Sequence, residues 1–153
     1  VSDLDGNVRD LLKAANLGVV PVIHAHGDNI PRLLQYVPQF EKVLGTTQTL
    51  PTCNIHNFGG FTDGDRCVFL ADVLGAKSIV LLGMDFGKEI GAFSRYQGDP
   101  FIKRKKLRIG KSLLEWLART SNTKMYNLTS QGVEIHGIEH INIKELRQIA
   151  PHD

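Results

Sequence analysis

Three short acidic segments stand where strands of a sheet are expected to end. They are Ser2-Asp3-Leu4-Asp5-Gly6, His26-Gly27-Asp28-Asn29 and Thr62-Asp63-Gly64-Asp65-Arg66. Carboxylates that lie close together raise one another's pKa, so a fold that gathers them usually does so around a cation. Carboxylate oxygen is the side-chain ligand that Mg²⁺ prefers. The sequence therefore predicts a magnesium site and, with it, chemistry on phosphate groups.

The first acidic segment has a spacing that suits metal binding. In an extended chain Asp3 and Asp5 point to the same side and can share one cation. A second interpretation is a turn in which the two acids cap the helix that follows. A third is a phosphatase of the haloacid dehalogenase type, whose first Asp attacks phosphorus. That pattern is weakened because Asn7 stands where Thr or Ser is usual and no apolar strand precedes it.

The second segment combines two histidines with an acid. His24 and His26 flank Ala25, so both side chains lie on one face of an extended strand. With Asp28 they resemble the start of a metallohydrolase site, His-x-His-x-Asp, but Asn29 stands where a further His would complete it. We therefore expect the histidines to form hydrogen bonds in the crevice and Asp28 to be an oxygen ligand.

The third segment is preceded by two glycines and is the most specific stretch of the chain. Gly59 and Gly60 let the backbone approach a phosphate or a flat ring, and Arg66 can hold a phosphate with two hydrogen bonds. The simpler interpretation is a turn in which Asp63 caps the following helix, and both can hold together. Asp28 and Asp65 are the alternatives for the residue that assists an attacking hydroxyl.

Asp85 and Lys88 follow the clearest buried strand, expected over residues 78–83. Asp85 is a candidate ligand or an acceptor for amine groups of a substrate. Lys88 either contacts phosphate or is simply exposed. The two residues add a fourth loop to the predicted site.

Apolar spacing predicts strands alternating with helices. The expected strands cover residues 19–24, 41–50, 53–58, 78–83 and 124–128, and the expected helices 7–16, 29–37, 65–74 and 101–121. Asn29 is expected to cap the second of these helices. Leu114, Trp116 and Leu117 are expected to face the core from the last of these helices, and Asn142 with Glu145 forms a capping box. This alternation is typical of an α/β, Rossmann-like, mostly parallel sheet with helices on both faces, whose ligands bind at the carboxyl ends of the strands.

Length and composition bound the class of protein. A chain of 153 residues with 42% apolar residues suits a single catalytic domain over residues 1–153. The strand that should present Asp3 would need residues before Val1, so we expect that the natural protein has an N-terminal region that this chain lacks. We expect a cytoplasmic protein without membrane contact, because no apolar run approaches about 20 residues and Val1-Ser2-Asp3 does not resemble a signal peptide.

Charge and cysteine content exclude further classes. A net charge of +2 is too small to indicate a nucleic-acid partner, although six basic residues fall between positions 103 and 111. Those cations either form a solvated helix face or meet a polyphosphate. Cys53 and Cys67 are expected to be buried free thiols, which does not indicate redox chemistry. Apolar residues on the long helix permit a homodimer.

Five stretches taken together resemble the archaeal 6-hydroxymethyl-7,8-dihydropterin pyrophosphokinase family, which is related to thiamine pyrophosphokinase. The stretches are SDLDGN, HAHGDN, GGFTDGDR, LLGMDFG and YNLTSQGVEIHG. The resemblance implies transfer of diphosphate from ATP to a reduced hydroxymethylpterin, leaving AMP, with Mg²⁺ required. It places Asp3, Asp5 and Asp28 at the metal. It also implies that the following residues contact the nucleotide or the pterin: Gly59, Gly60, Asp63, Asp65 and Arg66.

Two other functions remain open at this point. A metal-dependent nucleotide-sugar glycosyltransferase would use Asp3 and Asp5 to bind the metal on a sugar diphosphate. A non-catalytic nucleotide-binding module would bind ATP analogues without turnover. The residues alone do not separate a pterin from thiamine as the acceptor.

Overall fold

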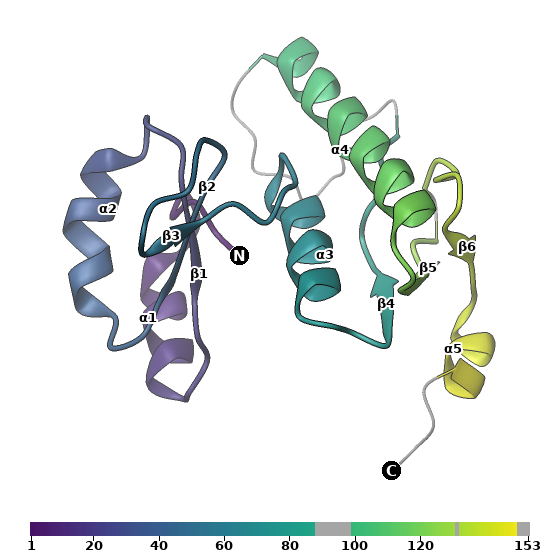
Figure 1. Cartoon of the computed structure of the whole chain (residues 1–153), viewed down its shortest axis with the longest axis horizontal. Helices are drawn as coiled ribbons and strands as arrows, with labels where there is room; N and C mark the ends of the chain where they lie inside the picture. Colours follow the sequence, from purple (N-terminus) through teal and green to yellow (C-terminus); the bar gives the residue numbers. More distant parts are fainter. Residues whose placement is uncertain (88–98, 131, 150–153) are drawn as a thin grey trace. The chain divides into compact units, whose positions relative to one another are not determined.

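The computed structural model describes residues 1–87, 99–130 and 132–149 (Figure 1). The chain divides into two compact units, Val1–Cys67 and Val68–Asp153. Each unit contains a three-stranded sheet in which all strands are parallel. The predicted α/β, Rossmann-like fold class is therefore confirmed. Lys88, a candidate phosphate contact, lies outside the described residues.

The sheet of the first unit has the strand order β1-β2-β3. Its elements are α1 (Val8–Asn16), β1 (Val22–Ala25), α2 (Ile30–Tyr36), a 3₁₀ turn (Val37–Gln39), β2 (Leu44–Thr47) and β3 (Ile55–His56). Ser2 pairs in parallel with β1, because its N–H donates to the Val22 carbonyl at 2.9 Å and its carbonyl accepts from His24 N–H at 2.9 Å. The first acidic segment thus starts directly beside β1.

Alternation along β1 separates a core face from a polar face. Ile23 packs with Leu4, Val8 and Phe40, and apolar residues of α1 and α2 surround this cluster. His24 points the other way and contacts Thr46 of β2. β1 begins later than the sequence predicts because Pro21 has no N–H to donate. The core face therefore holds the helices, and the opposite face is left for polar side chains.

The sheet of the second unit has the order β4-β5-β6. Its elements are β4 (Ser78–Leu81), α4 (Pro100–Thr120), β5 (Lys124–Asn127), β6 (Glu139–His140) and α5 (Ile143–Ile149), and α3 (Asp63–Val73) spans the boundary between the units. The sequence missed β6, which is only two residues long and has no apolar pattern. The capping box is confirmed, because Asn142 N–H donates to Glu145 Oε2 at 2.7 Å and Glu145 N–H donates to Asn142 Oδ1 at 3.2 Å.

Helices α3 and α4 pack against one face of the second sheet. The buried core includes Val68, Ile79, Leu114, Leu117 and Met125. The core prediction for Leu114 and Leu117 is confirmed. The prediction for Trp116 is wrong, since its side chain is 49% exposed. Its ring instead stacks on Phe69 from outside, with the ring centroids 6.2 Å apart.

The two cysteines lie at the surface. Cys53 and Cys67 are free but exposed, so the prediction of burial is wrong. On α3 the neighbours Val68 and Phe69 take the core positions, which turns Cys67 outward.

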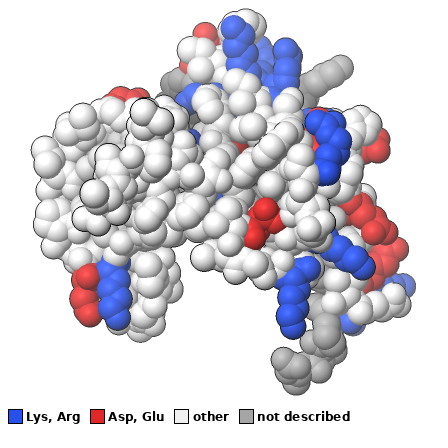
Figure 2. Space-filling model, in the orientation of Figure 1, with Lys and Arg blue, Asp and Glu red and all other residues white. Residues whose placement is uncertain are grey.

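Figure 2 shows Lys and Arg side chains gathered over α4, where Lys111 pairs with Glu115 at 2.5 Å. In the described part of the chain, no helix is both long and apolar enough to cross a membrane.

Candidate active site

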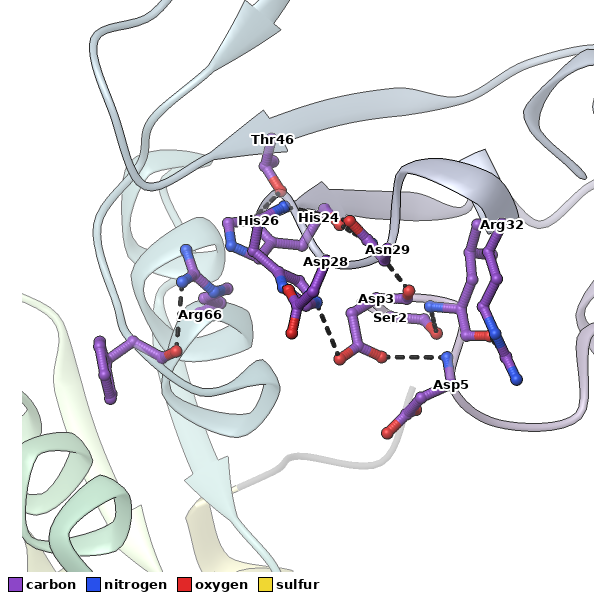
Figure 3. Close-up of polar contacts among 12 residues, drawn as sticks. Ser2, Asp3, Asp5, His24, His26, Asp28, Asn29, Arg32, Thr46 and Arg66 are labelled. Atoms are coloured by element: carbon purple, nitrogen blue, oxygen red, sulfur yellow. Dashed lines mark hydrogen bonds and ion pairs between the residues drawn. The ribbon is translucent and has the colours of Figure 1, made fainter. Parts of the chain in front are cut away.

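The first acidic segment forms a turn that is anchored in the core. Leu4 is completely buried and has a left-handed backbone, with φ at 70°. Its N–H donates to Ser2 Oγ at 3.0 Å, and its carbonyl accepts from the Arg32 guanidinium. Asp5 N–H donates to Asp3 Oδ1 at 3.1 Å. The segment is therefore not extended as expected, yet the turn still brings Asp3 and Asp5 together (Figure 3).

The two carboxyl groups respond differently to this closeness. The hydrogen bond that the protonated Asp5 carboxyl donates to Asp3 and then burial raise the pKa of Asp5, and the negative charges of Asp3 and Asp63 raise it further. Burial alone would raise the pKa of Asp3, but hydrogen bonds with Asp5 and the charge of His26 outweigh it and lower that pKa. Burial and then the charge of Asp3 raise the pKa of Asp63. Three carboxyl groups thus repel one another in one small region of the first unit.

His26 connects the first acidic segment to the second. Its Nε2 lies 3.3 Å from Asp3 Oδ2, and its Nδ1 contacts Asp28 Oδ1. The His26 ring also stacks on His24, with centroids 5.7 Å apart. The Asp28 side chain is 84% exposed. Asp28 therefore reaches the acidic pair through His26, and direct metal contact would require its side chain to turn.

Asn29 holds the two segments in place. It was expected to cap α2, but its side chain makes no capping hydrogen bond. Its amide nitrogen donates to the Asp3 carbonyl at 2.9 Å and to the His24 carbonyl at 2.7 Å, and its oxygen accepts from His26 N–H at 3.2 Å. The buried amide thereby fixes the backbone on both sides of the acidic pair.

His24 is buried on the polar face of β1. Its Nδ1 lies 3.2 Å from Thr46 Oγ1, and its side chain is 3% exposed. Burial is the main cause that lowers the pKa of His24 to about 4, with further lowering by the charges of Arg66 and His26. The imidazole is therefore neutral at physiological pH.

This low pKa predicts a pH dependence of stability. His24 in the unfolded chain takes up a proton near pH 6.5, whereas folded His24 takes one up only near pH 4. The free energy of unfolding should therefore fall as pH drops from 6.5 to 4, by roughly 3 kcal/mol from this residue. Urea unfolding of wild type and His24→Asn across this range measures the difference. The exposed-residue variant His56→Asn is the control, and an equally steep loss in His24→Asn would contradict the prediction.

The third acidic segment starts α3 with hydrogen bonds that converge on the Asp65 carboxylate. Asp65 is fully buried, and its carboxylate accepts from Phe61 N–H at 2.5 Å, from Thr62 N–H at 2.8 Å and from the Thr62 hydroxyl. Arg66 N–H donates to the Thr62 carbonyl at 2.9 Å. Thr62 and Asp65 therefore form the cap that was expected from Asp63. With these bonds made, the Asp65 carboxylate is not placed to assist a hydroxyl.

Arg66 lies beside the histidines rather than in solvent. Its side chain is 5% exposed, and its Nη2 donates to the Phe61 carbonyl at 3.2 Å. Burial lowers the pKa of Arg66, although Asp65 and Asp63 oppose that effect. One of the five N–H donors of Arg66 is used by the Phe61 carbonyl, and the two-bond contact with a phosphate stays a prediction.

The glycine turn makes this position of Arg66 possible. Gly60 has φ at 81°, and a Cβ placed there would lie 2.7 Å from Arg66 Cα and 2.8 Å from Arg66 N. Only glycine fits such a close approach in this conformation. Gly59 N–H donates to Asn57 Oδ1 at 3.0 Å, which holds the start of the turn. The close approach seen at Gly60 is to α3, and the expected approach of a phosphate or a flat ring to Gly59 and Gly60 stays a prediction.

Asp85 belongs to the second unit. Its carbonyl accepts from Val133 N–H at 2.9 Å, and the preceding Met84 N–H donates to Thr129 Oγ1 at 3.0 Å. These bonds join the loops at the carboxyl ends of β4 and β5. The ligand role of Asp85 stays a prediction.

The Asp3–Asp5 pair suits Mg²⁺ better than it suits a metal ion whose ligands all come from the protein. Among residues 1–87, 99–130 and 132–149, no three His, Cys, Asp or Glu side chains converge closely enough to hold a metal ion. Mg²⁺ commonly takes one or two carboxylates and completes its shell with water and substrate phosphates. Asp3 and Asp5 can supply such a pair, and their repulsion from Asp63 favours a cation there.

Three residues of this region were not identified as functional from the sequence. Arg32 holds the Leu4 carbonyl, Thr46 orients His24, and Asn29 joins the two segments. Only Asn29 carried a sequence signal, and that signal indicated a helix cap. All three act across 5 to 28 positions of sequence. Spacing within a single motif therefore could not find them.

Comparison with known proteins points to one family. A family model described as 6-hydroxymethylpterin diphosphokinase MptE-like matches residues 1–91. The chain is 47% identical over 132 residues to a protein of Methanothermobacter thermautotrophicus named 6-hydroxymethyl-7,8-dihydropterin pyrophosphokinase, covering 82% of this chain and 56% of that protein. Proteins of the same name from Pyrococcus furiosus and Methanocaldococcus jannaschii are 47% and 46% identical, covering 82% and 76% of this chain.

The match includes all three acidic segments. The match covers 55% of the Pyrococcus protein and 53% of the Methanocaldococcus protein, so the chain spans about half the length of the curated relatives it matches. The family model covers the whole first unit, which carries the acidic pair, the histidines and Arg66. The chain therefore belongs to the MptE-like family of 6-hydroxymethylpterin diphosphokinases.

Proposed function

We propose that this chain takes part in the Mg²⁺-dependent transfer of diphosphate from ATP to 6-hydroxymethyl-7,8-dihydropterin, giving AMP and the pterin diphosphate. The observation that carries the proposal is the Asp3–Asp5 pair, which lies beside Asp63 in a chain 47% identical to a protein named for this activity. Two carboxylates that favour a cation suit a reaction at the highly charged phosphates of ATP.

In the proposed reaction the hydroxymethyl oxygen forms a bond to the β-phosphorus of ATP. The bond from that phosphorus to the oxygen bridging it to the α-phosphorus breaks, AMP leaves, and the hydroxyl proton is lost. Mg²⁺ held by Asp3 and Asp5 would offset negative charge on the phosphate oxygens. The protein's main task is then to position the two substrates.

The remaining side chains supply positioning and a path for the proton. Asp28 is the stronger of the two candidates for assisting the hydroxyl, because its carboxylate is exposed while that of Asp65 is fully bonded. His26 orients Asp28 and Asp3 together. Arg66 adds a buried positive charge on the same side. These roles require no movement of the backbone that Asn29 holds.

A product assay tests the proposal. The chain is incubated with ATP, Mg²⁺ and 6-hydroxymethyl-7,8-dihydropterin, and AMP and pterin diphosphate are quantified by chromatography. We expect equal amounts of both products, none with EDTA, and recovery when Mg²⁺ is returned. Formation of ADP, consumption of a nucleotide sugar instead of ATP, or no product from a chain whose circular dichroism shows it folded would contradict the proposal.

A further inference from the structure

Two buried nitrogen atoms of the first unit have no hydrogen-bond partner among the described residues. They are His24 Nε2 and Arg66 Nε, on side chains that are 3% and 5% exposed. A buried polar atom left unpaired typically costs about 1–3 kcal/mol, so such atoms are uncommon unless a bound water or a ligand completes them. Figure 3 shows Arg66 reaching from α3 toward the two histidines.

The hydrogen bonds around His24 decide what its free nitrogen offers. Thr46 has one hydroxyl proton, which it donates to the Ile23 carbonyl at 3.2 Å. With that donation its oxygen accepts from His24, and we therefore assign the proton of the neutral imidazole to Nδ1. His24 Nε2 therefore presents a lone pair and acts only as an acceptor. Arg66 Nε, in contrast, always carries a proton and acts only as a donor.

This combination disfavours a metal ion and a phosphate. A metal ion at His24 Nε2 would be repelled by the guanidinium of Arg66, whose charge already lowers the pKa of His24. A phosphate oxygen is itself an acceptor, so it would face the lone pair of His24 Nε2 without forming a hydrogen bond. A neutral group that both donates and accepts a hydrogen bond satisfies both nitrogen atoms at once.

We propose that His24 Nε2 and Arg66 Nε bind a neutral, hydrogen-bonding group of the acceptor substrate, either its hydroxymethyl hydroxyl or the amide edge of its ring. The identity of the acceptor rests on the proposed function. The hydroxyl would donate to His24 and accept from Arg66 through one oxygen. The ring amide would use its N–H and its carbonyl.

The ligand reaches the pair by a movement of the Arg66 side chain. That side chain has several rotatable bonds, and its guanidinium is held by the hydrogen bond from Nη2 to the Phe61 carbonyl. His24 is fixed more firmly, by Thr46 on one side and by its place in β1. His24 thus supplies the fixed contact and Arg66 the adjustable one.

Binding measurements with two pterins test the pair. Dissociation constants are measured by calorimetry for 6-hydroxymethyl-7,8-dihydropterin and for 6-methyl-7,8-dihydropterin, which lacks the hydroxyl but keeps the ring amide. The key variant is His24→Asn, whose amide can still donate to Thr46 but does not reach the Nε2 position. His24→Gln reaches that position and is the rescue variant. His56→Asn is the control, since His56 is exposed on β3 of the same unit.

The pattern of losses identifies the group. If the hydroxyl is bound, His24→Asn weakens binding of the hydroxymethylpterin about tenfold, with little change for the methylpterin and partial recovery in His24→Gln. If the ring amide is bound, both pterins lose about tenfold. Unchanged affinity of both pterins in His24→Asn, or an equal loss in His56→Asn, overturns the proposal.

Nitrogen NMR of the imidazole gives a readout that a merely structural role would not move. In the free protein we expect a protonated Nδ1 and an unprotonated Nε2 at His24, and binding should shift the Nε2 resonance. A protonated Nε2 in the free protein overturns the proposal. Product formation by the wild type with unchanged affinities in His24→Asn refutes this inference alone. A missing product together with a selective loss in His24→Asn contradicts the transfer reaction and leaves the binding pair supported.

Discussion

An Asp3→Asn variant is expected to form the pterin diphosphate at least about 100-fold more slowly than wild type, since even residues one shell away from a metal commonly cost 10–100-fold. Asparagine keeps the acceptor for Asp5 N–H but removes the charge that the cation needs. The loss should be largest at low Mg²⁺ and partly recovered at high Mg²⁺. Initial rates measured across a Mg²⁺ series provide the test.

Asp10→Asn is the matched control for this experiment. Asp10 is an exposed carboxylate of α1 that pairs with Lys13 at 3.6 Å and accepts from Asn7 Nδ2 at 2.6 Å. Its replacement removes the same charge from the same unit and should leave the rate unchanged. Equal rates for Asp3→Asn and wild type at every Mg²⁺ concentration would show that Asp3 is not a ligand.

Gly60→Ala is expected to lower the free energy of unfolding by about 2–5 kcal/mol. The left-handed backbone costs an alanine about 1–2 kcal/mol, and the Cβ would sit 2.7 Å from Arg66 Cα, an overlap of the kind that costs about 1–3 kcal/mol. Relief of the overlap must move the first turn of α3, so Arg66 should be displaced as well. Chemical unfolding measures the first effect, and pterin affinity measures the second.

Two other glycines separate the causes. Gly18 also has a left-handed backbone, with φ at 95°, but an added Cβ meets nothing within 4 Å, so Gly18→Ala carries the conformational cost alone. Gly6 has open space and an ordinary φ, so Gly6→Ala should be close to neutral. If Gly60→Ala costs no more than Gly18→Ala, the close approach to α3 is not a constraint.

The sequence predicted the parallel α/β fold because each strand leaves a local signal. The strand expected over residues 78–83 is an apolar run between turn residues, and it forms over Ser78–Leu81, but the expectation of a buried strand was wrong for Val80 and Leu82, which are exposed. The closeness of Asp3 and Asp5 was also predicted, from an extended chain in which residues two positions apart share one side. The predicted extended conformation of this segment was wrong, because the left-handed φ of Leu4 depends on the core that receives its side chain.

Roles that depend on distant partners were beyond sequence reasoning. Asp65 looks like a free acid in the sequence, and only the turn at Phe61 and Thr62 shows that its oxygens are occupied. Asn29 precedes a helix, which indicated a cap, but the carbonyls of Asp3 and His24 compete successfully for its amide. The cytoplasmic location, the homodimer and an N-terminal region beyond this chain stay predictions.

Leu4 links the position of the Asp3–Asp5 pair to the thermal stability of the first unit. Its side chain is completely buried, while the residues on either side of it carry the acidic pair. The backbone that carries the two carboxylates therefore has no hinge of its own: it can rearrange only if Leu4 leaves the cluster that it shares with Val8, Ile23 and Phe40. Heat inactivation and melting of this cluster should follow a single curve, without a temperature range in which the unit is folded but the acidic pair is disordered.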